Sequence, residues 1–144
     1  MDTTRRLVEF VGNHWSLALA FVGLAILLIH AELRRQLDGI QHLGPHAATQ
    51  AMNTEGTVVL DVREDSEYKQ GHIPNALHIP LGQLGKRLPE LDKYRDRPLI
   101  AYCRTGNRSG SAARLLHKQG FATVHNLAGG IVAWQNANLP VTKK

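Results

Sequence analysis

The chain has 144 residues, 43% of them hydrophobic and 20% charged, which is the balance of one ordinary globular domain and excludes a disordered or collagen-like protein. Its single cysteine, Cys103, excludes an internal disulfide framework and a cysteine-rich zinc site. The net charge of +5 falls on the part after residue 40, because the first forty residues hold four basic and four acidic side chains. This modest excess lacks the basic stripe with interleaved aromatic residues that is typical of nucleic-acid binders, and it indicates a small-anion site instead.

The first 37 residues predict a membrane anchor. An uncharged apolar run extends over Ser16–Ile29, and apolar neighbours lengthen it to about twenty residues, which is enough to cross a bilayer. A buried core helix is the weaker alternative, because a helix that is apolar on every face needs a larger protein around it. We expect residues 1–37 to form a single-pass anchor with an apolar core at about residues 15–31. The neighbours that complete the expected span are Phe10, Val11, Gly12, Trp15 and Ala31.

A cleaved secretory signal peptide is the main competing interpretation, because Arg5 and Arg6 precede the apolar run. No pair of small residues in a cleavage pattern follows that run, which favours an uncleaved anchor. The positive-inside rule gives no orientation, since Arg34 and Arg35 balance the two arginines on the other side. The lone thiol favours a reducing compartment. We therefore expect an inner-membrane protein whose C-terminal domain faces the cytoplasm.

The rest of the chain, after a short connector at residues 38–42, alternates strand and helix patterns. Continuous apolar and β-branched runs predict buried strands at residues 57–60, 76–79, 99–102 and 123–127. Helical patterns lie between them, at residues 45–52, 65–70, 81–91 (interrupted by Pro89), 111–119 and 131–136. This alternation with short loops predicts an α/β fold, a mainly parallel sheet covered by helices.

Cys103 directly follows the predicted strand at residues 99–102, at the carboxyl edge where such sheets carry their active sites. A free thiol with a pKa near ~8.5 is mostly protonated at neutral pH, and only the thiolate is a nucleophile. The start of the next helix offers unpaired backbone N–H groups and partial positive charge. Arg104 and Arg108 add two cations, and Gly106 allows the backbone to form an anion nest. The pattern predicts a reactive cysteine rather than a buried structural one.

Four segments resemble the rhodanese family, and their order and spacing are specific together although each alone is modest. Asn75 stands where the family often has glycine, a change that turn geometry tolerates. The resemblance implies a rhodanese-like domain over residues 43–140, with a central, mainly parallel five-stranded sheet flanked by helices, and a tail at residues 141–144. The four segments are LDVR at residues 60–63 with Glu67–Tyr68, GHIPNA at residues 71–76 with Ile79–Pro80, the Cys103–Arg108 loop with Ser109, and LxGGIxAW at residues 127–134.

The resemblance implies sulfur transfer. In the family, the loop cysteine takes a sulfane sulfur from a donor such as thiosulfate, holds it as a persulfide, and passes it to cyanide, a thiol or a protein cysteine. Carried over to this sequence, Cys103 is the nucleophile. No metal and no organic cofactor is implied. The residues expected to bind the persulfide and the anionic donor are Arg104, Thr105, Gly106, Asn107 and Arg108. The residues expected to support the loops through hydrogen bonds and charge pairing are Asp61, Arg63 and His72, with Glu67 as a further partner.

Two alternatives remain open. Phosphatases of related architecture use a C-x5-R loop, whereas here the position of that arginine holds Ser109 and the arginine comes one residue earlier. The tighter loop favours sulfur over phosphate. The second alternative is a non-enzymatic module that docks proteins at the membrane. The expected partners are a small anionic sulfur donor, a thiol or protein-cysteine acceptor, the membrane and a membrane-protein client, but not nucleic acid.

Overall fold

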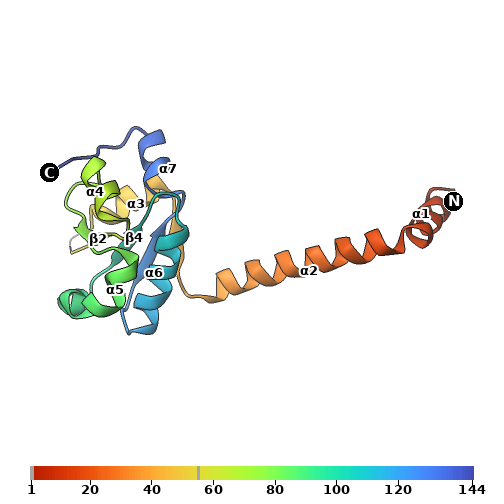
Figure 1. Ribbon diagram of the computed structural model, residues 1–144, viewed down its shortest axis with the longest axis horizontal. Helices are drawn as coiled ribbons and strands as arrows, with labels where there is room; N and C mark the ends of the chain where they lie inside the picture. The colour runs from red at the N-terminus through yellow and green to blue at the C-terminus, as the bar shows by residue number, and fades with distance from the viewer. Residues whose placement is uncertain (1, 55) are drawn as a thin grey trace. The chain divides into compact units, whose positions relative to one another are not determined.

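The computed structural model describes residues 2–54 and 56–144, and the chain divides into two units at Asp38 and Gly39. The first unit consists of two helices, α1 (Asp2–Asn13) and α2 (Trp15–Leu37) (Figure 1). The second unit, Gly39–Lys144, is an α/β domain.

Helix α2 is the apolar element of the first unit. The segment Trp15–Arg34 is long and apolar enough, by length and composition, to cross a membrane. Phe10–Gly12, which the sequence placed in the same span, belongs instead to α1, because the helix breaks at His14, where φ is −125° and ψ is 38°. The required length comes from residues after Ile29 instead. Helix α2 ends at Leu37 with Asp38 as its C-cap, and Gly39 follows with φ +67°.

The sheet of the second unit has five strands in the order β1-β5-β4-β2-β3, and every neighbouring pair is parallel. The predicted α/β class with a five-stranded parallel sheet is therefore confirmed. The strand at the β1 edge begins inside the segment expected to be a connector. It is only three residues long and half-exposed, so it leaves no apolar run in the sequence. The strands are β1 (Gln41–Leu43), β2 (Val58–Asp61), β3 (Leu77–His78), β4 (Leu99–Tyr102) and β5 (Val124–Leu127).

Helices cover both faces of this sheet. Alternate residues of each strand point to opposite faces, so Leu60 and Ala101 pack with the helices of one layer, and Val59 and Ile100 with those of the other. Burial on both faces explains the continuous apolar runs of β2 and β4. The first layer consists of α5 (Leu81–Arg87), the 3-10 helix η1 (Leu88–Tyr94) and α6 (Asn107–Lys118), and α5 contacts α6. The second layer consists of α3 (Pro45–Met52) and α7 (Gly130–Asn136) (Figure 1).

Two helices differ from their predicted bounds. The helical pattern at residues 81–91 divides into α5 and η1, because Pro89 lacks the N–H that a continuing α-helix needs. Helix α6 starts at Asn107, four residues before the predicted start at Ser111, since Gly106 with φ +103° forms its N-cap. Arg108 and Ser109 therefore belong to the first turn of a helix rather than to a loop.

A buried polar cluster ties the carboxyl ends of β2 and β4 to the following loop. Arg63 Nη2 donates to Asp61 Oδ2 and to the Gly71 carbonyl oxygen, both at 2.7 Å. The Tyr102 hydroxyl donates to Asp61 Oδ2 at 2.6 Å and accepts from Ile73 N–H at 3.0 Å. Burial, then the nearby Asp61 carboxylate, raises the pKa of Tyr102, so this hydroxyl stays protonated as a donor. The cluster fixes the loop that follows α4 (Asp65–Gln70).

His72 joins the same loop to the end of the chain. Its Nδ1 lies 3.0 Å from the Tyr68 carbonyl oxygen, and its ring stacks on that of Tyr68 with centroids 3.8 Å apart. Its backbone exchanges two hydrogen bonds of 2.8 Å with Thr142. Thr142, which lies in the expected tail, is thus paired with the domain, and His72 connects Tyr68 of α4 to this C-terminal segment.

We predict that Asp61→Asn destabilises the domain strongly. The Arg63 side chain is 6% exposed, and the loss of its counter-charge leaves a buried cation, which costs about 3 kcal/mol or more of unfolding free energy. Urea unfolding of the full chain in mild detergent, followed by Trp134 fluorescence in a Trp15→Phe background, measures this. Asp96→Asn, at an exposed position, is the control and should change stability by less than about 0.5 kcal/mol. Equal stability of the two variants would contradict the prediction.

Candidate active site

Cys103 lies between the end of β4 and the start of α6, and the residue is only 1% exposed. Its sulfur is nevertheless held by polar groups. Sγ accepts a hydrogen bond from the backbone N–H of Gly106 at 3.1 Å, and the Ser109 Oγ lies 3.4 Å away. The side chain also packs in the apolar cluster under α5 and α6. The sulfur is therefore both buried and hydrogen-bonded.

The ionisation of this sulfur depends on two opposing effects. Burial raises the pKa of the Cys103 thiol, because it disfavours the thiolate. Hydrogen bonds from the Ser109 hydroxyl, in the orientation in which it donates to the sulfur, and from the backbone N–H groups of Ser109, Gly106 and Thr105 act in the opposite direction and prevail, so that the pKa lies below its ordinary value. The N-terminus of α6 contributes these unpaired N–H groups. The site can hold a sulfur anion that is shielded from water.

The two cations expected near the sulfur have different surroundings. Arg104 is exposed. Arg108 donates from Nη1 and Nη2 to the two carboxylate oxygens of Glu67, both at 2.8 Å. Glu67, expected as a further partner of Asp61 and Arg63, makes its hydrogen-bonded ion pair with Arg108, and the charge of Arg63 also acts on it. The hydrogen bond from Arg108 lowers the pKa of Glu67 from 4.5 to about 2, so the charge of Arg108 is largely matched. Thr105 and Asn107 are exposed beside them.

Helix α7 closes over the loop that carries Cys103. The N–H of Ile131 donates to the Cys103 carbonyl at 2.9 Å, and that of Val132 donates to the Arg104 carbonyl at 3.2 Å. This approach requires glycine at position 130, where φ is +59° and a Cβ atom would lie 2.4 Å from the Arg104 oxygen. Gly130, the first residue of α7, is therefore required by the close contact of two backbones.

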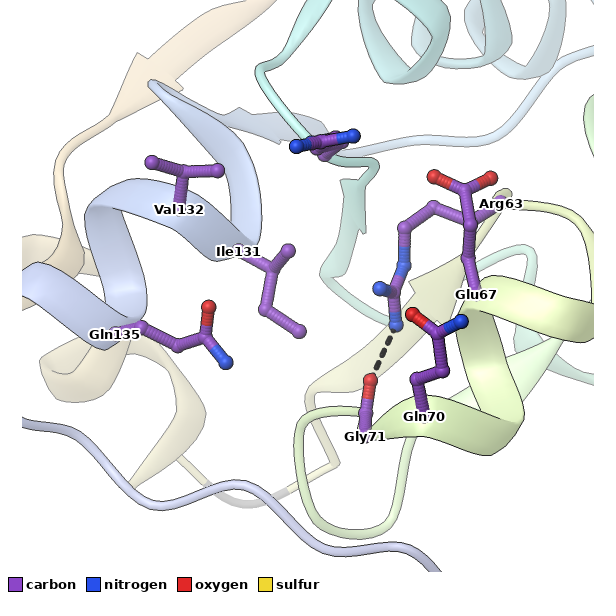
Figure 2. Close-up of a pocket in the computed structure, with 8 residues that line it drawn as sticks. Arg63, Glu67, Gln70, Gly71, Ile131, Val132 and Gln135 are labelled. Carbon is purple, nitrogen blue, oxygen red and sulfur yellow. Dashed lines mark hydrogen bonds between the residues drawn. The ribbon is translucent and has the colours of Figure 1, made fainter.

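A hollow of about 300 Å³ borders the loop at Arg104. Figure 2 shows Glu67 and Gln70 of α4 on one side of it, and residues of α7, including Gln135, on the other, with the hydrogen bond from Arg63 to Gly71 between them. Its walls combine charges, two side-chain amides and the apolar pair Ile131 and Val132. Within residues 2–54 and 56–144, no group of three His, Cys, Asp or Glu side chains is placed to hold a metal ion.

Two residues of this site were missed by the sequence analysis. Asn126, which is 3% exposed, donates to the Gly106 carbonyl at 3.0 Å and accepts from Ser109 at 2.5 Å. His42 of β1 lies beside the same amide, with its Nδ1 3.1 Å from Asn126 Nδ2. The one available signal for Asn126 was a polar residue inside a buried strand.

Comparison with known proteins identifies the domain. The family described as "Rhodanese-like domain" matches residues 44–137, which is more than half of the chain. The chain belongs to the rhodanese-like family. Within this family of sulfurtransferases, its relatives include a protein of Allochromatium vinosum named "Sulfurtransferase", which is 42% identical over 89 residues, 62% of this chain and 81% of the relative.

Two further comparisons concern length and fold. The Escherichia coli (strain K12) relative, named "Uncharacterized protein YibN", is 27% identical over 140 residues, which cover 96% of this chain and 98% of that protein. The crystal structure of a rhodanese-related protein from Thermoplasma volcanium aligns with a TM-score of 0.66 and 29% identity, over 72% of this chain and 99% of that one. The rhodanese-like fold thus accounts for the second unit.

Glu67→Gln tests the ion pair with Arg108 at low pH. The pKa of Glu67 is lowered from 4.5 to about 2 on folding, so the unfolded chain binds more protons between these values. The stability that the pair contributes is therefore present above about pH 4.5 and is lost as the pH falls towards about 2. We expect Glu67→Gln to lower the urea midpoint at about pH 6, and this deficit to shrink steadily below about pH 4.5.

The matched control for this experiment is Glu90→Gln. Glu90 pairs with Arg87 at 2.8 Å in a similar forked geometry but is 54% exposed, so its deficit should be smaller. A deficit of Glu67→Gln that does not depend on pH would contradict the assigned pair.

Proposed function

We propose that this rhodanese-like protein is a membrane-tethered sulfurtransferase, which moves a sulfane sulfur from a small anionic donor such as thiosulfate to a thiol acceptor through a persulfide on Cys103. One observation carries the proposal. The sulfur of the only cysteine lies at the N-terminus of α6, where a backbone N–H at 3.1 Å points at it. The name of the Allochromatium vinosum relative supports the general reaction class.

The chemistry follows from an ionised sulfur in an anion-binding loop. The Cys103 thiolate attacks the sulfane sulfur of thiosulfate, a new S–S bond forms, and sulfite leaves with the electron pair of the bond that breaks. An acceptor thiolate, or cyanide in an assay, then attacks the outer sulfur, and the Cys103 thiolate is released. The N–H groups of Thr105 and Gly106 stabilise both anionic forms, the thiolate and the persulfide.

Binding of the donor depends on Arg104 more than on Arg108. Arg104 is exposed and lines the hollow between α4 and α7, whereas the charge of Arg108 is matched by Glu67. In this proposal Arg104 attracts the sulfonate of the donor, and Arg108 holds α4 against the loop through Glu67. Gly106 supplies the turn, and Asn107 begins the helix whose N–H groups face the sulfur.

The two alternatives make different predictions. A phosphatase of related architecture needs a loop wide enough for a tetrahedral phosphate beside its cysteine, but here the arginine comes one residue earlier, as Arg108, and Ser109 occupies the position of the C-x5-R arginine. A docking module needs no ionised thiol, and the hydrogen bonds that lower the pKa of Cys103 would then have no purpose. Sulfur transfer uses both features.

The proposed membrane anchor is helix α2. Its segment Trp15–Arg34 meets the length and hydropathy of a membrane span, and the alignment with the Escherichia coli relative extends over nearly the whole of both chains. The lone thiol favours the reducing, cytoplasmic side of the inner membrane for the domain, where in this proposal it meets a membrane-protein client.

Persulfide formation on Cys103 is the direct test. After treatment of the purified full chain with thiosulfate, we expect its intact mass to rise by one sulfur atom and to return when a thiol reductant is added. Cyanide should likewise release thiocyanate. Cys103→Ala should abolish both, and Arg104→Gln should raise the KM for thiosulfate about tenfold with little change in kcat. Turnover of a phosphate monoester without any persulfide would reverse the proposal.

Membrane insertion has its own test. The full chain, expressed in bacteria, should stay in the membrane fraction after alkaline extraction and be released by detergent, because about twenty apolar residues span the bilayer. Leu24→Lys, near the middle of the span, disfavours insertion by about 3 kcal/mol and should release part of the chain. For orientation, Lys143→Cys in a Cys103→Ser background should react with an impermeant thiol reagent only after the inner membrane is opened.

A further inference from the structure

A chain of hydrogen bonds leads from the sulfur of Cys103 across the sheet to β1. Ser109 Oγ lies 3.4 Å from Cys103 Sγ and 2.5 Å from Asn126 Oδ1. Asn126 Nδ2 lies 3.0 Å from the Gly106 carbonyl oxygen and 3.1 Å from His42 Nδ1. Asn126 and His42 are register partners in the parallel pair of β5 and β1, which is why their side chains meet on one face of the sheet.

The Gly106 carbonyl determines which way the Asn126 amide faces. A carbonyl oxygen only accepts, so the amide atom beside it must be the nitrogen. The amide oxygen therefore faces Ser109 and, since it also only accepts, the Ser109 hydroxyl gives it its single hydrogen. The second amide hydrogen goes to Nδ1 of His42, which accepts it as a neutral ring with its own hydrogen on Nε2. Every side-chain hydrogen of Ser109 and Asn126 then has a partner.

This assignment makes Asn126 and the sulfur compete for one hydrogen. The Ser109 hydroxyl cannot donate to both at once, and its contact with Asn126 is the shorter one, 2.5 Å against 3.4 Å. In this arrangement the backbone N–H of Gly106 still donates to Sγ, but the hydroxyl offers the sulfur only its lone pairs. The lone pairs of the Ser109 oxygen can accept a hydrogen bond from a protonated S–H group, whereas a thiolate or a persulfide anion needs the hydroxyl hydrogen as a donor.

We infer that Asn126 and His42 are positioning residues, which control the ionisation of Cys103 by deciding where the Ser109 hydroxyl points. Asn126 draws the hydroxyl hydrogen away from the sulfur, and His42 holds the amide in that orientation from β1. Rotation of the hydroxyl towards the sulfur then favours the anion. The inference deepens the proposed function, because it concerns the same sulfur, but it predicts ionisation rather than transfer.

The test is a titration of the thiolate by its ultraviolet absorbance in the purified full chain, where Cys103 is the only thiol. Asn126→Leu frees the hydroxyl to donate to the sulfur. We expect the thiolate fraction below the midpoint to rise about fivefold, the equivalent of one hydrogen bond. His42→Leu should move the midpoint in the same direction by less. His42→Gln should restore it, because a side-chain carbonyl can accept the amide hydrogen.

Ser109→Ala is the decisive control. Without the hydroxyl, neither Asn126→Leu nor His42→Leu has a route to the sulfur, so neither should move the midpoint of the Ser109→Ala variant. A shift that persists in that background, or an unchanged midpoint in folded Asn126→Leu, overturns the inference. If Asn126→Leu does not fold, the variant of the half-buried His42 takes its place. An unchanged midpoint of the thiolate titration in His42→Leu then overturns the inference. Persulfide formation is measured separately by mass, so failure of the proposed function is distinguished from failure of this inference.

Discussion

The structure around the sulfur depends on one constraint, which is that an anion removed from water needs hydrogen-bond donors. Cys103 is 1% exposed, and burial by itself favours the neutral thiol. The donors come from the first turn of α6, whose N–H groups have no partners within the helix. Gly106, with φ +103°, turns the chain tightly enough to aim its own N–H at Sγ. The strand–turn–helix unit is therefore the part that the remaining elements hold in place.

The neighbouring backbone keeps those donors aimed inward. Ile131 and Val132 of α7 donate to the carbonyls of Cys103 and Arg104, so that the oxygens of these two peptide units are bound to α7 and face away from the sulfur. Only glycine at position 130 lets the two backbones come so close. The same contact that packs α7 on the domain thus orients the loop. This explains why the Gly-Gly segment lies far from the cysteine in sequence and against its loop in space.

Local physics made most of the fold predictable. Strands buried on both faces leave continuous apolar runs, so β2 and β4 were found within one residue. The short edge strand β1 leaves no such run, so it was not predicted. Asn107 and Arg108 are polar residues at the start of α6, and for this reason they were predicted to lie in a loop. The candidate nucleophile Cys103 was proposed from its neighbours in sequence, and the structure places the Gly106 N–H 3.1 Å from its sulfur. The pairing of Arg108 with Glu67 joins residues 41 positions apart, and no local pattern encodes it.

The hydrogen-bond chain to His42 was beyond sequence reasoning for a similar reason. The contact of Asn126 with His42 depends on the register of β5 against β1, over a separation of 84 residues. Register is set by the packing of the whole sheet and not by either strand alone. Once the register is known, however, simple donor and acceptor rules assign the side-chain hydrogens of Ser109 and Asn126, because the Gly106 carbonyl can accept but not donate.

Burial of Cys103 also limits what can react at the site. Cys103 is 1% exposed as a residue, and in the proposed reaction a second sulfur bound to Sγ would extend about 2 Å further from it. An acceptor therefore meets the outer sulfur of a persulfide and not Sγ itself. The hollow beside Arg104, at about 300 Å³, is larger than thiosulfate needs. Under the proposed function, its two glutamine side chains and the apolar pair Ile131 and Val132 would contact the flanking groups of a larger thiol acceptor.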